Sequence, residues 1–169
     1  MKRELFSIAK NKTWELLPLP EGRKPLPCKW VNKKKITSNI ESYKARLVAK
    51  GFKQEYGVNF QELFSPVVKM TTLRMLFALV ATKDMELDQM DVITAFLHGD
   101  LEEEIYMQQP KGFVQKGKEY LVWKLLKSLF GLKQSSRQWY HKFDAFMRSL
   151  DYKRGNEDPC LYVKRQPNG

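Results

Sequence analysis

The sequence predicts a single α+β domain in which helices are combined with an antiparallel sheet. Its 169 residues are 43% hydrophobic, which is enough apolar material for one buried core. Short segments of strand character alternate with longer segments in which apolar residues recur every three or four positions. The sequence has neither internal repeats nor low-complexity tracts.

The first expected element is a short amphipathic helix over residues 1–11. Leu5, Ile8 and Ala9 recur there at helical spacing, so they define one apolar face. Residues 17–27 contain four prolines, and each proline fixes its backbone and lacks an N–H donor. We therefore expect an extended connector in this part of the chain.

An antiparallel hairpin is expected next. Residues 29–36 and 43–51 have strand character, and the polar residues 37–42 between them suit a longer loop. The hairpin is strongly cationic, which leaves two interpretations open: a solvated surface or a contact with phosphates. Its basic side chains include Lys33, Lys34, Lys35, Lys44, Arg46 and Lys50.

Residues 65–84 predict a core helix that begins after a cap at Thr71 or Thr72. One face of this helix is apolar and is made of Leu73, Leu76, Phe77 and Val80. Residues 85–92 are then expected to form a strand that carries Asp91 near its end.

The chain should then turn and return as a second strand. Residues 94–100 predict a short helix or loop, and residues 103–110 predict a strand that Pro110 closes. Residues 120–124 are a further candidate strand.

The last third of the chain predicts a helix that runs to Leu150. Gly131 marks a change of chain direction, and Ser135 or Ser136 is the expected cap. The helix carries an apolar stripe, and such a stripe more often packs in a core than forms a platform for stacked bases. The stripe is formed by Trp139, Phe143, Phe146 and Leu150.

Residues 160–165 predict a strand for which the sequence shows no partner.

Charge favours a polyanionic partner. The 30 Lys and Arg residues outnumber the 19 Asp and Glu residues, which gives a net charge of +11. Residues 1–53 and 111–169 are basic, whereas residues 54–110 are acidic. A polymerase needs such a division, because phosphates bind Lys and Arg while divalent metals bind carboxylates. A basic but otherwise ordinary surface is the alternative interpretation.

Cysteine and histidine usage predicts neither a zinc site nor a disulfide. Cys28 and Cys160 are single and distant, and His98 and His141 have no metal-ligand spacing to them. This usage fits a reducing intracellular compartment. The N-terminal segment lacks the apolar run of a signal peptide, and no stretch approaches the roughly 20 apolar residues of a membrane span.

The heptad MDVITAF, residues 90–96, carries the most informative chemistry. Two-metal nucleotidyl transfer requires a carboxylate on a rigid strand, and Asp91 can supply it together with the carbonyl of Val92. A ring at Phe96 would then lie against the sugar of an incoming nucleotide and exclude a 2′-hydroxyl. Taken alone the heptad is a weak indication, because an Asp at a strand end more often forms a turn and a Phe more often packs in a core.

Five segments resemble, in order, the reverse transcriptase of copia-type long-terminal-repeat retrotransposons. Together they span about residues 10–165. The resemblance implies an RNA-directed DNA polymerase of the right-hand type, with fingers, palm and thumb and two Mg²⁺ ions. The segments are WELLPLPEGRKPLPCKWV, YKARLVAKGF, FSPVVKMTTLRMLFALVA, ELDQMDVITAFLHGDLEEEIYMQQPKGF and KSLFGLKQSSRQWYHKF.

The resemblance also assigns roles to residues. Asp91 matches the first catalytic and metal-binding Asp of the palm, with Val92 beside it, and Phe96, preceded by Ala95, matches the steric gate against ribonucleotides. The hairpin matches the strands that clamp the triphosphate, and GLKQSS matches a loop beneath the nucleotide. Further nucleotide contacts are then Arg46, Lys35, Gly131, Lys133 and Gln134. Nucleic-acid contacts are then Lys33, Lys34, Lys44 and Lys50.

The resemblance implies one partial reverse transcriptase domain over residues 1–169. About residues 1–90 would be fingers and the entry to the palm, and about residues 84–169 a partial palm with interleaved fingers elements. The Tyr-x-Asp-Asp hairpin with the other two catalytic carboxylates is expected after residues 160–165, beyond the end of this sequence. We therefore expect no polymerisation by this chain alone, because one carboxylate cannot hold two divalent ions.

The implied partners are an RNA or DNA template-primer, a deoxynucleoside triphosphate and the rest of a Pol polyprotein with protease, integrase and ribonuclease H. The parent element would act in a cytoplasmic virus-like particle or in the nucleus, and no membrane is implied. Two alternatives remain open: a non-catalytic, basic nucleic-acid-binding fragment, or a degenerate relic of a retrotransposon.

Overall fold

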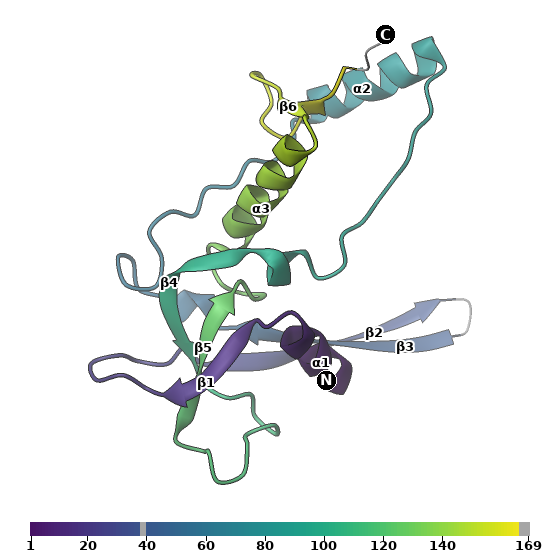
Figure 1. Cartoon of the computed structure of the whole chain (residues 1–169). Helices are drawn as coiled ribbons and strands as arrows, with labels where there is room; N and C mark the ends of the chain where they lie inside the picture. The colour runs from purple at the N-terminus through teal and green to yellow at the C-terminus, as the bar shows by residue number, and fades with distance from the viewer. Residues whose placement is uncertain (38–39, 166–169) are drawn as a thin grey trace.

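A computed structural model describes residues 1–37 and 40–165 of the chain (Figure 1). Within these residues no helix is long and apolar enough to cross a bilayer. The elements in chain order are α1 (Lys2–Lys10), β1 (Trp14–Pro18), β2 (Cys28–Thr37), β3 (Ile40–Ala49), the 3₁₀ helix η1 (Gly51–Lys53), α2 (Met70–Lys83), the 3₁₀ helix η2 (Ala95–His98), β4 (Asp100–Met107), β5 (Leu121–Lys127), α3 (Ser135–Ser149), β6 (Lys153–Arg154) and β7 (Tyr162–Val163).

The antiparallel sheet of β1, β5 and β4 contributes to the buried core cluster through β4 and β5, and β5 lies in the middle of the sheet. Trp14 of β1 and Ile105 of β4 each lie opposite Leu125 of β5. Trp14 also stacks on Trp123, with ring centroids 4.2 Å apart. Ile105 and Met107 are fully buried. The predicted α+β class with an antiparallel sheet is confirmed, as are the strands β4 and β5 and the short helix η2.

β1 occupies part of the segment that the prolines predicted to be a connector. Its ladder to β5 runs from Trp14 to Pro18, so the connector over residues 17–27 begins later than expected. A proline can stand at the end of an edge strand, where its missing N–H costs no ladder bond. β1 is such an edge, because β5 is its one partner among the described strands.

β2 and β3 form the predicted antiparallel hairpin, with Cys28 opposite Ala49 at its base and Thr37 opposite Ile40 at its far end. The expectation of a longer loop over residues 37–42 is wrong, because most of these residues continue the ladder. The base of the hairpin is joined to the sheet by backbone bonds. One of them runs from the N–H of Leu26 to a carbonyl of β4 at 2.7 Å.

α3 begins at Ser135, close to the predicted start, but the predicted cap at Ser135 or Ser136 is wrong. Gln134 is the N-cap residue, and no side chain bonds to the first turn at this position. The hydroxyl of Ser135 instead donates to the carbonyl of Leu129 at 2.6 Å. The hydroxyl therefore fixes the preceding loop rather than the helix end.

The apolar stripe of α3 is less buried than predicted. Trp139 and Phe143 are half-buried, and Phe146 is 56% exposed. The buried residues of α3 are Ser135 and Gln138, in the first turn, where η2 and β4 contact the helix. The rest of α3 extends away from the sheet (Figure 1), so the stripe meets fewer neighbours there than a core helix would.

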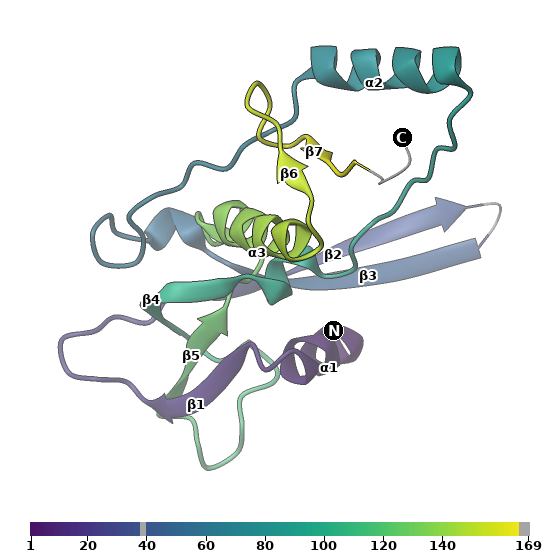
Figure 2. The same ribbon diagram turned by 45° about the horizontal axis from the view of Figure 1, so that its top comes forward.

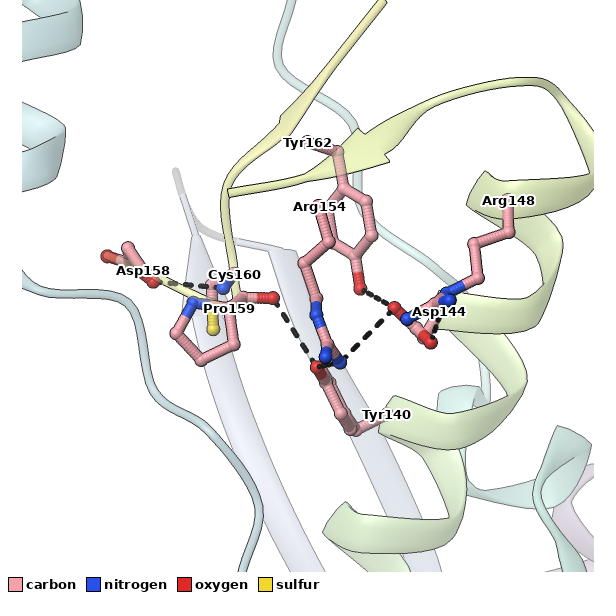
Figure 3. Close-up of polar contacts among 8 residues, drawn as sticks. All are labelled: Tyr140, Asp144, Arg148, Arg154, Asp158, Pro159, Cys160 and Tyr162. Carbon is pink, nitrogen blue, oxygen red and sulfur yellow. Dashed lines mark hydrogen bonds and ion pairs between the residues drawn. The ribbon is translucent and has the colours of Figure 1, made fainter. Parts of the chain in front are cut away.

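β7 pairs with β6, which supplies the partner that the sequence did not show for residues 160–165. Asp144 of α3 holds this pair to the helix (Figure 3). Its carboxylate accepts hydrogen bonds from the hydroxyl of Tyr162 at 2.7 Å and from Nε of Arg148 at 2.8 Å. Burial, and then the bond to Asp144, raise the pKa of Tyr162, so this hydroxyl keeps its proton and remains a donor.

α2 stands apart from the sheet in both views (Figures 1 and 2). The prediction of a core helix is wrong, because α2 has no buried residue and Phe77 is 54% exposed. The predicted cap at Thr71 or Thr72 is also wrong, since the helix begins directly after Lys69. The carboxylate of Asp158 takes the place of a local cap and accepts the backbone N–H of Lys69 at 2.9 Å.

Residues 85–92 form no strand, so the predicted strand that carries Asp91 is wrong. A strand needs a neighbour whose N–H and C=O groups face its own. None of the described strands pairs with this segment, and Met90 is 91% exposed. Asp91 therefore lies on an extended segment, which ends where Thr94, at φ +58°, turns the chain into η2.

The central strand provides a test of this core. Leu125 is 2% exposed, whereas its neighbour Leu126 on the other face of β5 is 39% exposed. Leu125→Ala should lower the free energy of unfolding by about 2–5 kcal/mol, because it leaves a cavity. Leu126→Ala should change it by about 0.5 kcal/mol or less. Urea unfolding followed by circular dichroism measures both, and equal losses would contradict this packing.

Candidate functional site

One cavity of about 280 Å³ brings together six of the predicted site residues. It lies between β3, the start of α1 and the segment that leads into η2. Residues from distant parts of the sequence therefore face one cavity. Five of them were predicted to bind a nucleotide or a metal ion, and Lys44 was predicted to bind nucleic acid. The six residues are Lys44, Arg46, Asp91, Val92, Ala95 and Phe96.

β3 directs two cations into this cavity. Lys44 and Arg46 are two positions apart, so their side chains leave the strand on the same face. Leu47 and Ala49 leave on the opposite face and are buried in the core, at 0% and 2% exposure. Burial of Leu47 and Ala49 determines which face of β3 packs against the core. The opposite face, which carries Lys44 and Arg46, therefore turns towards the cavity.

The ring of Phe130 lies against the guanidinium group of Arg46. Its Cζ lies 5.1 Å from the centroid of the Phe130 ring, a cation–π distance. Phe130 in turn meets Phe96 edge to face, with centroids 5.0 Å apart. The cation proposed for phosphate and the ring proposed for the sugar thus share one neighbour, Phe130.

η2 fixes Phe96 more firmly than the chain fixes Asp91. Leu97 is fully buried, and its N–H donates to the carbonyl of Thr94 at 2.8 Å. Phe96 stands directly before this buried residue, so its backbone is held. Asp91 lies earlier, on the exposed extended segment. The cavity therefore has a rigid aromatic side and a less constrained carboxylate.

A second carboxylate, Glu4 of α1, lines the same cavity. Burial raises the pKa of Glu4 above its usual value. A hydrogen bond from the backbone of Leu47 and the positive charges of Arg46 and Lys44 act in the opposite direction without cancelling the effect of burial. The cavity thus presents two acidic and two basic side chains.

Comparison with known proteins identifies the family. The profile described as "Reverse transcriptase (RNA-dependent DNA polymerase)" matches residues 11–169. The chain belongs to this family. It is 56% identical over 167 residues to the "Retrovirus-related Pol polyprotein from transposon TNT 1-94" of Nicotiana tabacum, an alignment that covers 98% of this chain. It is 37% identical over 166 residues, 96% of the chain, to the corresponding polyprotein "from transposon RE1" of Arabidopsis thaliana.

These relatives are copia-type Pol polyproteins, so the resemblance inferred from the sequence is confirmed. The chain spans only 13% of the tobacco polyprotein and 11% of the Arabidopsis polyprotein. It thus corresponds to a short part of each polyprotein. No solved structure matches the chain.

Three predicted site residues of this reverse transcriptase chain lie in the loop before α3 and do not line the cavity. The amide of Gln134 is fully buried and bonds to the side chain of Gln54 at 2.9 Å and to the carbonyl of Asn59 at 2.8 Å. Nζ of Lys133 lies 4.3 Å from the ring centroid of Phe60. Gly131 packs against β3. In this structure the three residues hold the loop in place.

The hairpin lysines also divide into different positions. Lys33 is exposed and lies directly opposite Lys44 in the ladder. Lys34 forms an ion pair with Glu41, and Lys50 follows the end of β3. The side chain of Lys35 lies outside the described part of the structure. Of the predicted hairpin cations, Lys44 and Arg46 are the two that line the cavity.

The donor groups present do not fit a two-ion Mg²⁺ centre. Two-metal sites need several carboxylates, because each hard cation takes about six oxygen ligands. Among residues 1–37 and 40–165, no group of three or more His, Cys, Asp or Glu side chains is placed to hold a metal ion. Asp91 and Glu4 are the two carboxylates that line the cavity, and Glu4 lies in the field of Lys44 and Arg46.

Sequence reasoning missed Glu4 and Phe130. Phe130 directly precedes Gly131 in the segment KSLFGLKQSS, so its position beside a predicted site residue was a signal. Glu4 lies before the first residue that the family profile matches. The sequence alone contains nothing to bring α1 next to β3.

The approach of Gly131 to β3 can be tested separately from its backbone angle. Gly131 has φ +90°, and a Cβ atom there would lie 2.1 Å from the carbonyl oxygen of Ala49. Gly57 has φ +78° with nothing within 4 Å, so Gly57→Ala should cost only the left-handed strain of about 1–2 kcal/mol. Gly131→Ala should cost about 1–3 kcal/mol more, because a backbone must move. Urea unfolding measures both variants, and equal losses would refute the close approach.

Proposed function

We propose that this chain forms the fingers and the first part of the palm of a reverse transcriptase, and that it binds the incoming nucleotide. About residues 1–90 are assigned to the fingers and the entry to the palm, and about residues 84–169 to part of the palm with interleaved fingers elements. The observation that carries the proposal is the convergence of Arg46, Asp91 and Phe96 on one cavity.

The chemistry of these residues suits a nucleoside triphosphate. Arg46 offers a planar fork of donors to phosphate oxygens, and Lys44 adds a point charge beside it. Phe96 lines the same cavity and meets the Phe130 ring on which Arg46 lies, so a sugar would lie against Phe96 when the phosphates meet Arg46 and Lys44. A bulky ring at that position favours a deoxyribose over a ribose, because it leaves little room for a 2′-hydroxyl.

Catalysis is assigned to the parent polyprotein. We propose that Asp91 and the carbonyl of Val92 contribute one side of a Mg²⁺ site, and that carboxylates from elsewhere in the polyprotein complete it. When bound, the ions would stabilise the charge that develops on the transferred phosphate. The residues of this chain then bind and orient the nucleotide, and template-primer and the rest of the polyprotein are the further partners.

A nucleotide-binding test separates the cavity from general charge. Arg46→Gln should weaken dATP binding by about tenfold or more, because a charge-assisted bond to phosphate contributes about 1.5–3 kcal/mol. Arg74→Gln removes the same charge from α2, outside the cavity, and should leave affinity nearly unchanged. Isothermal titration of the purified chain measures both dissociation constants.

The proposal fails if the two arginine variants weaken dATP binding equally, or if the unaltered chain binds no dATP. Phe96→Ala should remove any preference for dATP over ATP in the same titration. The purified chain should not extend a primer when Mg²⁺ is supplied, since Asp91 alone cannot position two ions. Primer extension by the purified chain, if Asp91→Asn abolished it, would contradict the assignment of catalysis to the parent polyprotein.

A second candidate function is nucleic-acid binding without catalysis. Lys33 and Lys44 lie directly opposite each other in the β2–β3 ladder, an arrangement in which like charges repel. Such a pair destabilises an isolated hairpin and favours a phosphate backbone laid across it. The two functions are compatible, because a polymerase binds its template beside the nucleotide.

Charge reversal on the hairpin tests this second function. Lys33→Glu combined with Lys44→Glu should weaken binding to a single-stranded oligonucleotide by about tenfold or more and reduce its salt dependence, because phosphate contacts are lost. Lys116→Glu combined with Lys118→Glu makes the same charge change on a distant exposed loop. Fluorescence anisotropy at several salt concentrations measures the affinities. Equal effects of the two pairs would show that net charge alone governs binding.

A further inference from the structure

The proposed function leaves Glu4 unexplained. This carboxylate shares the cavity with Lys44 and Arg46, the two cations assigned to phosphate. A site that only binds a highly anionic ligand gains nothing from an extra negative charge beside its cations, since like charges repel. Glu4 therefore opposes the ligand that the rest of the cavity attracts.

The position of Glu4 is fixed by the core. Ile8 of α1 is 0% exposed and belongs to the central cluster, and Leu5 packs against the same cluster. Glu4 lies four residues before Ile8, hence on the same side of the helix. α1 contacts β3 directly, so the carboxylate is held beside the strand that carries the two cations.

The charges around Glu4 come from each element that faces it. Lys44 and Arg46 project from β3, and Asp91 faces the cavity from the extended segment. The amino group of Met1, directly before α1, also acts on Glu4. Within the cavity the two acidic side chains balance the two basic ones, whereas removal of Glu4 would leave an excess of one positive charge.

We propose that Glu4 is an internal competitor of the nucleotide: its carboxylate occupies the electrostatic field of Lys44 and Arg46 and weakens the binding of polyphosphate anions. The proposal rests on the proposed nucleotide site. Glu4 thereby limits how tightly the phosphates are held, because a triphosphate must overcome the attraction between this carboxylate and the cations. Burial of Glu4 strengthens the competition, since less water screens its charge.

The test uses inorganic tripolyphosphate as the probe, without metal ions and at low salt. Glu4→Gln keeps the shape of the side chain and removes its charge, so it should tighten tripolyphosphate binding by about tenfold. Glu21→Gln makes the same charge change on the connector after β1 and should have little effect. Isothermal titration gives the dissociation constants, and the gain at Glu4 should shrink as added salt screens the charges.

The pH dependence of tripolyphosphate binding supplies a second measurement. The raised pKa of Glu4 means that it takes up a proton at a higher pH than an ordinary glutamate. The difference in affinity between the unaltered chain and Glu4→Gln should therefore narrow as the pH falls, and it should begin to narrow at a higher pH than an ordinary glutamate would require. A Glu4 that merely holds α1 in place would give the opposite result, because its loss would weaken binding. Glu4→Ala repeats the comparison if Glu4→Gln folds poorly.

The outcomes separate this inference from the proposed function. If the unaltered chain binds tripolyphosphate and Arg46→Gln weakens it, but Glu4→Gln leaves it unchanged or weaker, the competitor role is overturned and the nucleotide site stands. If the unaltered chain, Arg46→Gln and Glu4→Gln all fail to bind, both proposals are overturned. Tighter binding by Glu4→Gln with Glu21→Gln unchanged supports the competitor role.

Discussion

The close contact between residues 129–131 and the base of the β2–β3 hairpin is the constraint on which the site depends. The N–H of Ala49 donates to the carbonyl of Phe130 at 2.8 Å, and a Cβ at Gly131 would come within 2.1 Å of the Ala49 carbonyl oxygen. Backbones approach this closely only where a residue lacks Cβ. Gly51, directly after the hairpin, meets the Gly131 carbonyl in the same way. The direction of the hairpin, and with it the position of Arg46, follows from this contact.

The same contact places the aromatic side of the cavity. Phe130 precedes Gly131, so the backbone that holds the hairpin also sets the ring beneath Arg46 and beside Phe96. Groups proposed for phosphate and for sugar thus depend on one short loop. A buried amide, that of Gln134, fixes the far end of this loop. Binding sites need such supporting contacts, because a displacement of about 1 Å at a functional group is enough to lose affinity.

The sequence predicted the elements whose pattern is local and missed those that depend on partners. The β2–β3 hairpin, β4, β5 and α1 follow from alternation or helical spacing within a few residues. β1 was hidden because Pro18 and the prolines after it dominate the composition, although an edge strand tolerates a terminal proline. The apolar stripe of α2 is real, since Leu73, Leu76 and Val80 are half-buried, but a stripe shows which face turns inward and not how much covers it.

The candidate site likewise combines residues that a local sequence pattern predicts with residues that only tertiary contacts bring in. Asp91, Val92, Ala95 and Phe96 were predicted together because one heptad carries them. The sequence did not show that, among the hairpin cations, Lys44 and Arg46 line the cavity, because that depends on which face of β3 packs in the core. Glu4 could not be found at all, because only the packing of Ile8 brings α1 beside β3. Net charge has a similar limit: +11 predicts attraction to a polyanion over long distances, yet the cavity itself holds equal numbers of acidic and basic side chains. Under the proposed function, the net charge of the whole chain would set the attraction to nucleic acid, whereas the balance of charges inside the cavity would set how tightly phosphates are held.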